Sequence, residues 1–344
     1  MNLLNFIGSR LKRFFPQCKL YGFSVSIWSL LYPFYRLLGP FKYSFANHKH
    51  RAILKYLLIR YKDVLNQYSE SIQIPAFIID PQSTIWVCWW DGEEAMPDLV
   101  RACYNSVKQH SGTHQVKLIT RYNYGEYINI PDYIMKKVDS KIITITHFSN
   151  MVRASLLYDY GGIWMDATIL TLKNISPDNM LFFTLKAPAE KSVSITLLRN
   201  AGLSNKTAKI YNKSLYQTSR WSGFLLAGGK QCPVFSYMRD ILYAYWKDHD
   251  DQIDYVLYDY TISLGYDNIP VMKSLIDNVP NSDAEKYEME NCLNSEYSDE
   301  LYKRFSKDTY HKLSWKKDFK THTKDNKLTV YGYLLETYLQ GNPN

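Results

Sequence analysis

Residues 149–170 constrain the fold more than any other part of the chain, because a helical pattern there runs directly into a strand pattern. Apolar residues recur at helical spacing in the first half, and Ser149 is a good N-cap for that helix. Gly161-Gly162 stops the helix, since glycine readily adopts the left-handed conformation that ends helices. Residues 163–170 then predict a strand that carries Asp166 within it. A helix that leads straight into a buried strand indicates an α/β fold.

Strand and helix patterns alternate on the amino-terminal side of that segment as well. Short apolar, β-branched runs predict strands, and amphipathic runs that follow a proline predict helices between them. Strands joined by helix-length crossovers favour an α/β fold with a mostly parallel sheet, whose nucleotide ligands bind at the carboxyl ends of the strands. The predicted strands are 84–90, 116–120 and 142–146, and the predicted helices begin near Pro97 and Pro131.

Composition excludes several classes of protein. With 344 residues, 46% of them hydrophobic, the chain can bury a sizeable core, and it is not collagen, a coiled coil or a polytopic membrane protein. Its five cysteines are widely spaced without a CxxC pair, which argues against a disulfide framework or structural zinc and favours a reducing compartment. The net charge of +8 and the 30 tyrosines suit nucleic acid, an anionic membrane, phosphorylated ligands or sugars. No nucleic-acid-binding motif is recognisable, so we expect no nucleic-acid partner.

The first 75 residues differ in pattern from the rest, and we predict two regions, 1–75 and 76–344. Met1–Pro16 is a short basic amphipathic segment of the kind that lies in an anionic membrane interface. Residues 47–68 predict a helix rich in Lys and Arg. No uncharged apolar run reaches the roughly 18–20 residues of a spanning helix, and no signal-peptide cleavage site follows. Two interpretations remain open: these helices pack on the main domain, or they attach the protein peripherally to the inner face of the cell membrane.

Asp166 and Arg153 are the first candidate functional pair. An acid within an apolar strand is costly unless a cation or metal partners it. The predicted N-cap would place Arg153 in the first turn of its helix, where the positive end of the helix favours anions. A helix start, an arginine and a strand carboxylate together can bind a diphosphate and a divalent cation. The alternative is an internal ion pair between these two residues, without a ligand.

The string F-S-N-M-V-R-A-S-L-L-Y-D-Y-G-G-I-W-M-D-A-T, residues 148–168, resembles the core motif of capsular polysaccharide synthesis glycosyltransferases. These are related to glycosyltransferase family 32, the sugar transferases with a DXD motif. Weaker matches extend the resemblance from Trp86–Gly92 to Trp315. It implies a GT-A-like, Rossmann-type nucleotide-sugar transferase domain, a UDP-sugar or similar donor, and a polysaccharide or lipid-linked oligosaccharide acceptor. It further implies Mn²⁺ or Mg²⁺ and transfer with retention of anomeric configuration.

The resemblance assigns roles to residues of the motif. Arg153 matches the arginine that contacts the donor sugar or phosphate, and Trp164 matches the aromatic position before the acid. Asp166 matches the first acid of DXD, which makes it both a catalytic and a metal-binding candidate. Two positions depart from the pattern: Thr168 replaces the second acid as a metal ligand, and Asn150 replaces the acid after the motif's serine on the donor side. Threonine is a poorer ligand for a divalent cation than a carboxylate.

Further candidates come from the carboxyl half. The segment 310–316 resembles the late histidine-lysine segment of related retaining transferases, where the histidine completes the metal site and a lysine touches the diphosphate. This implies His311 as a metal ligand, with Lys312 and Lys316 on the donor; a surface basic run on a helix is the alternative. Trp221 and Ser222 match a region beside the donor sugar and acceptor, and for Trp221 simple packing is the alternative.

Asp254 and Asp259 are both candidates for a carboxylate near the anomeric carbon or on the acceptor hydroxyls. Asp259 is our choice for the catalytic role, because of its i+5 offset within an apolar segment. Residues 279–309 are polar and predict a surface loop with a helix. Together these features predict a cytoplasmic glycosyltransferase that extends a surface polysaccharide. A capsule-type phosphosugar transferase and a non-catalytic polysaccharide- or lipid-binding component are the alternatives. A glycosidase is disfavoured, since no acid pair flanking a scissile bond is evident.

Overall fold

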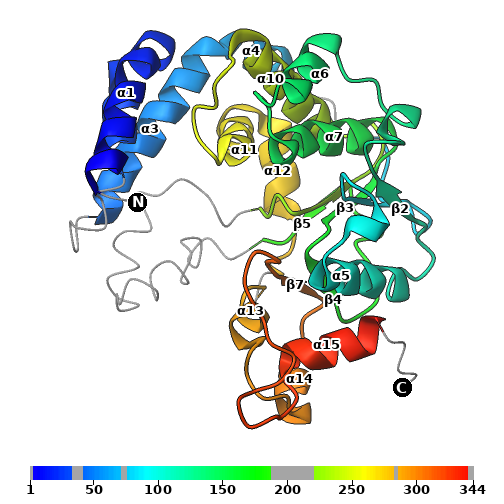
Figure 1. Ribbon diagram of the computed structural model, residues 1–344. Helices are drawn as coiled ribbons and strands as arrows, with labels where there is room; N and C mark the ends of the chain where they lie inside the picture. Colours follow the sequence, from blue (N-terminus) through cyan, green and yellow to red (C-terminus); the bar gives the residue numbers. More distant parts are fainter. Residues whose placement is uncertain (1–2, 33–41, 71–75, 187–220, 283–285, 340–344) are drawn as a thin grey trace.

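A five-stranded sheet forms the centre of the molecule, in the strand order β2-β1-β3-β6-β5. The computed structural model describes residues 3–32, 42–70, 76–186, 221–282 and 286–339 (Figure 1).

The amino-terminal half of the sheet is parallel and the other half is not. Strands β1 (Ile85–Cys88), β2 (Val116–Ile119) and β3 (Gly162–Asp166) run in the same direction. Strand β6 (Leu225–Gly228) pairs antiparallel with β3, and β5 (Phe182–Thr184) pairs antiparallel with β6. The α/β prediction is therefore confirmed, with a mixed sheet that contains a parallel core.

Side chains alternate between the two faces of this sheet, and helices cover both faces. One face packs against α7 (Ile145–Asp159) and α10 (Pro233–Asp248), and the other packs against α5 (Asp98–Gln109). The α7 face carries Trp86, Trp164, Phe182 and Leu226. The α5 face carries Ile85, Val87, Ile163, Met165, Leu225 and Ala227. Because residues two apart in a strand share a face, Asp166 lies on the α7 side together with Trp164.

A smaller layer below the sheet brings the carboxyl-terminal part of the chain beside β3. Strand β4 (Ile169–Thr171) pairs antiparallel with β7 (Tyr310–Lys312), and Ile169 is the register partner of Lys312. This ladder fixes Lys312 next to the turn that follows Asp166. Helices α13 (Glu288–Cys292), α14 (Asp299–Phe305) and α15 (Val330–Leu339) complete the layer, at the bottom of Figure 1.

The amino-terminal region is a set of helices docked on the α10 side of the molecule. Its helices are α1 (Leu3–Tyr21), α2 (Phe23–Leu31), α3 (Lys42–Arg60) and α4 (Lys62–Ser69), drawn in blue at the upper left of Figure 1. Their buried side chains belong to the same hydrophobic cluster as those of α10 and α11 (Leu257–Asn268). Within the part of the chain that is described, none of the helices combines the length and the apolar character needed to cross a membrane. Helices α6 (Asp132–Asp139) and α12 (Pro270–Asn278) complete the helical layer.

The predicted start of the helix before the Gly-Gly pair is wrong. The side chain of Thr144 accepts the backbone N–H of His147 and caps α7, so the helix begins at Ile145. The predicted strand 142–146 is consequently the approach to this helix and its first two residues. Ser149 lies inside α7, where its hydroxyl donates to the carbonyl of Thr146 at 2.8 Å. Arg153 is therefore in the middle of the helix, far from the positive end that was expected to assist it.

The predicted strand 163–170 is two strands instead of one. Strand β3 ends at Asp166, a turn takes Ala167 and Thr168, and β4 starts at Ile169. Because β4 leaves the central sheet to pair with β7, the chain changes direction directly after the carboxylate. Asp166 thus lies at the carboxyl edge of the sheet, where ligands of α/β folds bind.

Position 162 requires a glycine, both because of its backbone conformation and because the backbone of Thr84 lies close to it. Its φ is +100°, and a Cβ there would lie 2.3 Å from the carbonyl oxygen of Thr84. We expect Gly162→Ala to lower the free energy of unfolding by about 3 kcal/mol, because it adds backbone strain and pushes β3 from β1. Urea unfolding measures this difference. Gly125→Ala is the matched control, since a Cβ there meets no atom within 4 Å; equal losses in the two variants would contradict the expectation.

Candidate active site

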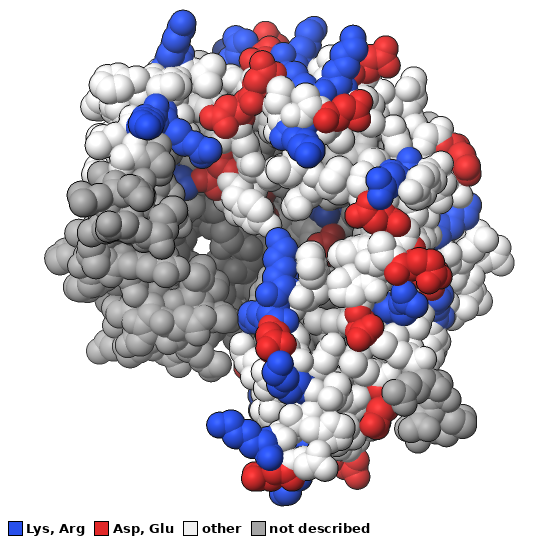
Figure 2. All heavy atoms as spheres, viewed as in Figure 1, with Lys and Arg blue, Asp and Glu red and all other residues white. Residues whose placement is uncertain are grey.

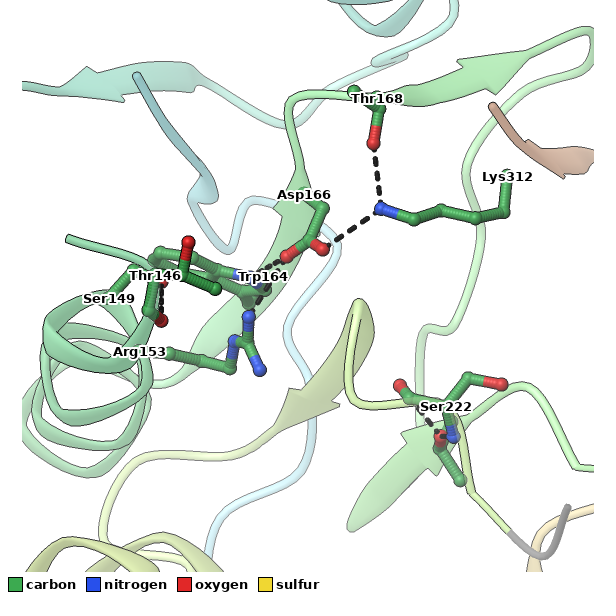
Figure 3. Close-up of polar contacts among 9 residues, drawn as sticks. Thr146, Ser149, Arg153, Trp164, Asp166, Thr168, Ser222 and Lys312 are labelled. Carbon is green, nitrogen blue, oxygen red and sulfur yellow. Dashed lines mark hydrogen bonds and ion pairs between the residues drawn. The ribbon is translucent and has the colours of Figure 1, made fainter. Parts of the chain in front are cut away.

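Asp166 is the centre of the candidate site, and both of its carboxylate oxygens are hydrogen-bonded (Figure 3). Oδ1 accepts the indole N–H of Trp164 and the Nη2 of Arg153, each at 2.9 Å. Oδ2 accepts the ammonium of Lys312 at 3.0 Å. The carboxylate therefore lies between two cations, one from α7 and one from β7, which are far apart in the sequence.

Arg153 is held rigidly on one side of the carboxylate. Its guanidinium carbon is 4.8 Å from the ring centroids of both Trp164 and Tyr258, and its side chain is 6% exposed. Its Nε atom is buried and has no hydrogen-bond partner among the described residues. An arginine stacked between two rings keeps its charge in a fixed place.

Lys312 approaches the carboxylate from the other side. Its ammonium also donates to the hydroxyl of Thr168 at 2.7 Å and lies 5.2 Å from the ring centroid of Phe224. Lys286 lies 5.5 Å from the same ring, and its carbonyl accepts the backbone N–H of Lys312 at 2.7 Å. Arg153 and Lys312 thus hold Asp166 between them, and Lys286 lies beside Phe224 with its ammonium on the Ser222 hydroxyl.

Lys286 is a basic residue beside Phe224 that the sequence analysis missed. It falls in the polar segment 279–309, which predicts only a surface loop with a helix, and no motif in the sequence marks it. Its place beside Phe224 depends on a tertiary contact that periodicity does not reveal. The face of the molecule in Figure 2 is hollowed near its centre, and basic side chains stand along the hollow.

The charges of this cluster favour an ionised Asp166. Burial alone would raise the pKa of its carboxyl, but Lys312 and Arg153 outweigh burial and hold that pKa below its usual value. The carboxylate is therefore negative at neutral pH. Arg153 and Lys312 carry two positive charges against the single charge of this carboxylate, so they can attract an anion such as a diphosphate.

The described residues do not fit a divalent cation held by protein ligands. The ammonium of Lys312 lies where the carboxylate and the Thr168 hydroxyl would bind a metal. His311 is fully buried on the opposite face of β7, and its Nε2–H donates to the carbonyl of Phe305 at 3.1 Å. Among the described residues, no group of three His, Cys, Asp or Glu side chains could hold a metal ion. The Mn²⁺ or Mg²⁺ implied by the resemblance therefore stays a prediction, and we derive no step from it.

Trp221 and Ser222 face inward in this structure. Trp221 is 1% exposed, and its indole N–H donates to Oδ1 of Asp259 at 3.3 Å. The Ser222 hydroxyl donates to the carbonyl of Leu185 at 3.0 Å and accepts the ammonium of Lys286 at 2.8 Å. Figure 3 shows Ser222 separated from the Asp166 group. The packing alternative for Trp221 is therefore the one that matches its burial.

Two other donor-side candidates do not contact Asp166. Asn150 is buried in α7, one turn before Arg153. Lys316 is exposed beyond β7, with its ammonium 6.0 Å from the ring centroid of Trp315. That tryptophan packs edge-on against Trp89, which follows β1, at 5.8 Å between ring centroids. The proposed contacts of Asn150 and Lys316 with the donor stay predictions.

Asp259 lies in the first turn of α11 and offers a pH-dependent test. Burial raises the pKa of its carboxyl to about 6, and the hydrogen bond from Trp221 opposes this shift.

A carboxyl whose pKa is raised by folding stabilises the fold below about pH 4 and loses that contribution as the pH rises through about 6. Asp259→Asn is therefore expected to raise the free energy of unfolding by about 2 kcal/mol at pH 7.5, and by little at pH 4. Urea unfolding at both values measures this; an equal effect at both would contradict it.

A cavity of about 300 Å³ includes Lys286 in its lining. It is lined by Asn174, Ser176, Phe183, Leu185, Ser282, Lys286, Lys307, Asp308, Thr309 and Tyr310. Hydroxyl, amide and ammonium groups dominate this lining. Lys286 thus lines this cavity and also donates a hydrogen bond to Ser222.

Comparisons with known proteins place the chain in a family. No curated protein matches it in sequence. Among solved structures it is similar to one titled PaToxG Glycosyltransferase, with a TM-score of 0.35 and 13% identity, over 85% of this chain and 96% of that one. The link to glycosyltransferase family 32 and the DXD assignment stay predictions. Residues 39–334 match the family described as capsular polysaccharide synthesis protein, and this confirms that the chain belongs to that family.

Proposed function

We propose that this protein is a glycosyltransferase that moves a sugar from a nucleotide-sugar donor to a growing surface polysaccharide or lipid-linked oligosaccharide. The observation that supports it is the group formed by Arg153 and Lys312 around Asp166, at the carboxyl edge of the sheet. This group offers fixed positive charge at the place where α/β folds bind nucleotides. Membership of the capsular polysaccharide synthesis family supplies the biological context.

The proposed reaction depends mainly on positive charge that stabilises the leaving diphosphate. Transfer breaks the bond between the anomeric carbon of the sugar and a phosphate oxygen, and the nucleoside diphosphate leaves with that electron pair. The oxygen of an acceptor hydroxyl forms the new bond to the anomeric carbon, and its proton passes to the leaving diphosphate or to water. Negative charge grows on the phosphates as the bond lengthens. Arg153 and Lys312 are already oriented by Asp166, so they can stabilise that charge without reorganising.

Asp166 is in this proposal a positioning residue. It holds an arginine from α7 and a lysine from β7 on opposite sides of one carboxylate. When a diphosphate binds, the two cations can be shared between the carboxylate and the phosphate oxygens. The resemblance implies a metal ion bound to Asp166 and Thr168. In this proposal the ammonium of Lys312, which bonds to both residues, supplies the positive charge instead.

The finer features of the proposal rest on the resemblance. They are a GT-A-like fold, a UDP-sugar donor, retention of anomeric configuration and action on the cytosolic side of the membrane. The mixed sheet with its parallel core, and the carboxylate at its carboxyl edge, support the first of these. Asp259, next to the Tyr258 that stacks on Arg153, is the proposed second carboxylate.

Ligand-induced thermal stabilisation tests the proposal. The purified protein is heated with nucleoside monophosphates, nucleoside diphosphates and nucleotide sugars, each with EDTA and with Mn²⁺. We expect stabilisation by one nucleoside diphosphate and its sugar, with loss of the effect in Asp166→Asn. Release of a nucleoside monophosphate on turnover would instead identify a phosphosugar transferase. No stabilisation by any nucleotide would support the non-catalytic binding component.

A further inference from the structure

We propose that the exposed side of α1, together with the start of α2, is a surface that binds an anionic membrane. We call it the anchor face and define it by Leu11, Lys12, Phe15, Lys19 and Phe23. It lies on the amino-terminal helices, away from the Asp166 site, and it does not depend on the proposed function. Three observations carry the proposal: the distribution of charge, the exposure of large apolar side chains, and the way the opposite side of the helices is fastened.

The net positive charge of the protein comes entirely from its first 62 residues. These contain eleven Lys and Arg and not one Asp or Glu, because the first acid of the chain is Asp63. The whole chain has 41 basic and 33 acidic residues, so the remainder has 30 against 33 and carries a net charge of −3. A basic region attached to a slightly acidic domain is directed toward a negatively charged partner.

Large apolar side chains stand among these basic residues. Phe15 is 77% exposed, Phe23 67% and Leu11 50%. Phe14 links the two exposed phenylalanines, since its ring centroid is 5.5 Å from that of Phe15 and 6.1 Å from that of Phe23. Exposed aromatic rings in one group are unfavourable in water and favourable at a lipid interface.

Four exposed side chains of α1, two apolar and two basic, share one side of the helix. With about 100° between successive residues, Leu11, Lys12, Phe15 and Lys19 fall within an arc of about 100°. Lys12 and Lys19 are exposed, whereas Tyr21, on the opposite side of the helix, is buried. Toward the upper left, where Figure 1 places α1 and α3, Figure 2 shows Lys and Arg side chains with uncharged surface between them and acidic side chains beside them.

The opposite side of these helices is fastened to the main domain. The Tyr21 hydroxyl lies 3.0 Å from that of Tyr245 and donates to the carbonyl of Asp251 at 2.6 Å. On α3, Arg60 pairs with Asp248 at 2.8 Å. These contacts fix which side of α1 faces the protein, so the anchor face is left directed outward.

Membrane lipid explains this combination better than nucleic acid does. Phosphates of either ligand would pair with Lys12 and Lys19, but the leucine and phenylalanine side chains between them need an apolar environment. Acyl chains below anionic headgroups supply both in one layer. The expected mode is a helix that lies in the interface plane.

Sedimentation with lipid vesicles tests the anchor face. The full chain is mixed with vesicles of phosphatidylcholine alone, or with about one third phosphatidylglycerol, at low and high salt. We expect binding to the anionic vesicles only, weakened by salt. The double variants Phe15→Ser/Phe23→Ser and Lys12→Gln/Lys19→Gln are each expected to lower the partition coefficient at least about tenfold.

Matched variants elsewhere on the surface serve as controls. Tyr122→Ser/Tyr255→Ser removes two aromatic side chains that are 76% and 72% exposed, and Lys320→Gln/Lys324→Gln removes two exposed lysines. Both should bind vesicles like the unaltered protein. Equal binding to neutral vesicles, or unchanged binding of the anchor-face variants, would overturn the proposal. Circular dichroism confirms folding, and nucleotide-induced stabilisation in the same variants reports on the transferase proposal separately.

Discussion

Asp166→Asn is expected to lower the rate of sugar transfer by about 10²- to 10³-fold while the protein stays folded. The carboxylate accepts hydrogen bonds from donors on both of its oxygens. An amide has only one oxygen, so in either orientation its NH₂ group would face Lys312 or the Arg153–Trp164 pair. One of the two cations would lose its anchor. Steady-state kinetics with the donor identified by thermal stabilisation measures the loss.

Asp91→Asn is the control for this substitution, because it removes the same charge from an exposed ion pair with Arg121. We expect its rate to stay near that of the unaltered protein. Since the pKa of Asp166 is lowered by folding, its stabilising contribution is present above the unfolded value of about 3.9 and is lost as the pH falls further. The stabilities of Asp166→Asn and the unaltered protein should therefore converge in acid. An unchanged transfer rate would leave Asp166 with a structural role only.

Lys312→Met is expected to lower the transfer rate about 100-fold, with no restoration by added Mn²⁺ or Mg²⁺. Methionine keeps much of the length of the side chain but removes the ammonium that bonds to Asp166 and Thr168. Arg153 alone would then stabilise the leaving diphosphate. EDTA should leave the unaltered protein active, because the positive charge belongs to the chain itself.

Lys316→Met provides the matched control, since Lys316 is an exposed lysine four residues further on. A large effect in Lys316→Met with a small one in Lys312→Met would move the phosphate contact to the exposed lysine. Complete loss of activity in EDTA, together with near-normal rates in Lys312→Met, would establish a metal site in place of the lysine.

Local patterns in the sequence were sufficient to predict the framework of the site. The alternation of apolar runs with amphipathic runs predicted β1, α5, β2 and α7, because each of these elements is encoded by its own residues. The Gly-Gly pair marked the boundary between α7 and β3. Since side chains along a strand alternate in direction, Asp166 had to share a face of the sheet with Trp164. Helix α7, which directly precedes β3, packs on that same face. The pairing of Arg153 with Asp166 was therefore within reach of the sequence.

Other features depended on competition between equally plausible local structures. Ser149 and Thr144 can both cap a helix, and the apolar residues 142–146 resemble a strand as much as the approach to a helix. The choice of Thr144 is made by tertiary packing. In the same way, His311 and Lys312 are neighbours, and only the pairing of β7 with β4 decides that Lys312 faces Asp166 while His311 faces Phe305.

The contacts that fasten the amino-terminal helices have a consequence for the reach of the protein. Tyr21, Arg60 and Lys49 each bind groups of the main domain directly: Tyr245, Asp248 and Asp254. A domain held in this way cannot swing on a tether. If the anchor face rests on a bilayer, the Asp166 site stands at one set height above the headgroups and in one orientation. Acceptors would then be selected by how far their reactive end projects from the lipid. The amino-terminal helices would set the distance between the membrane and the site as well as bind the membrane.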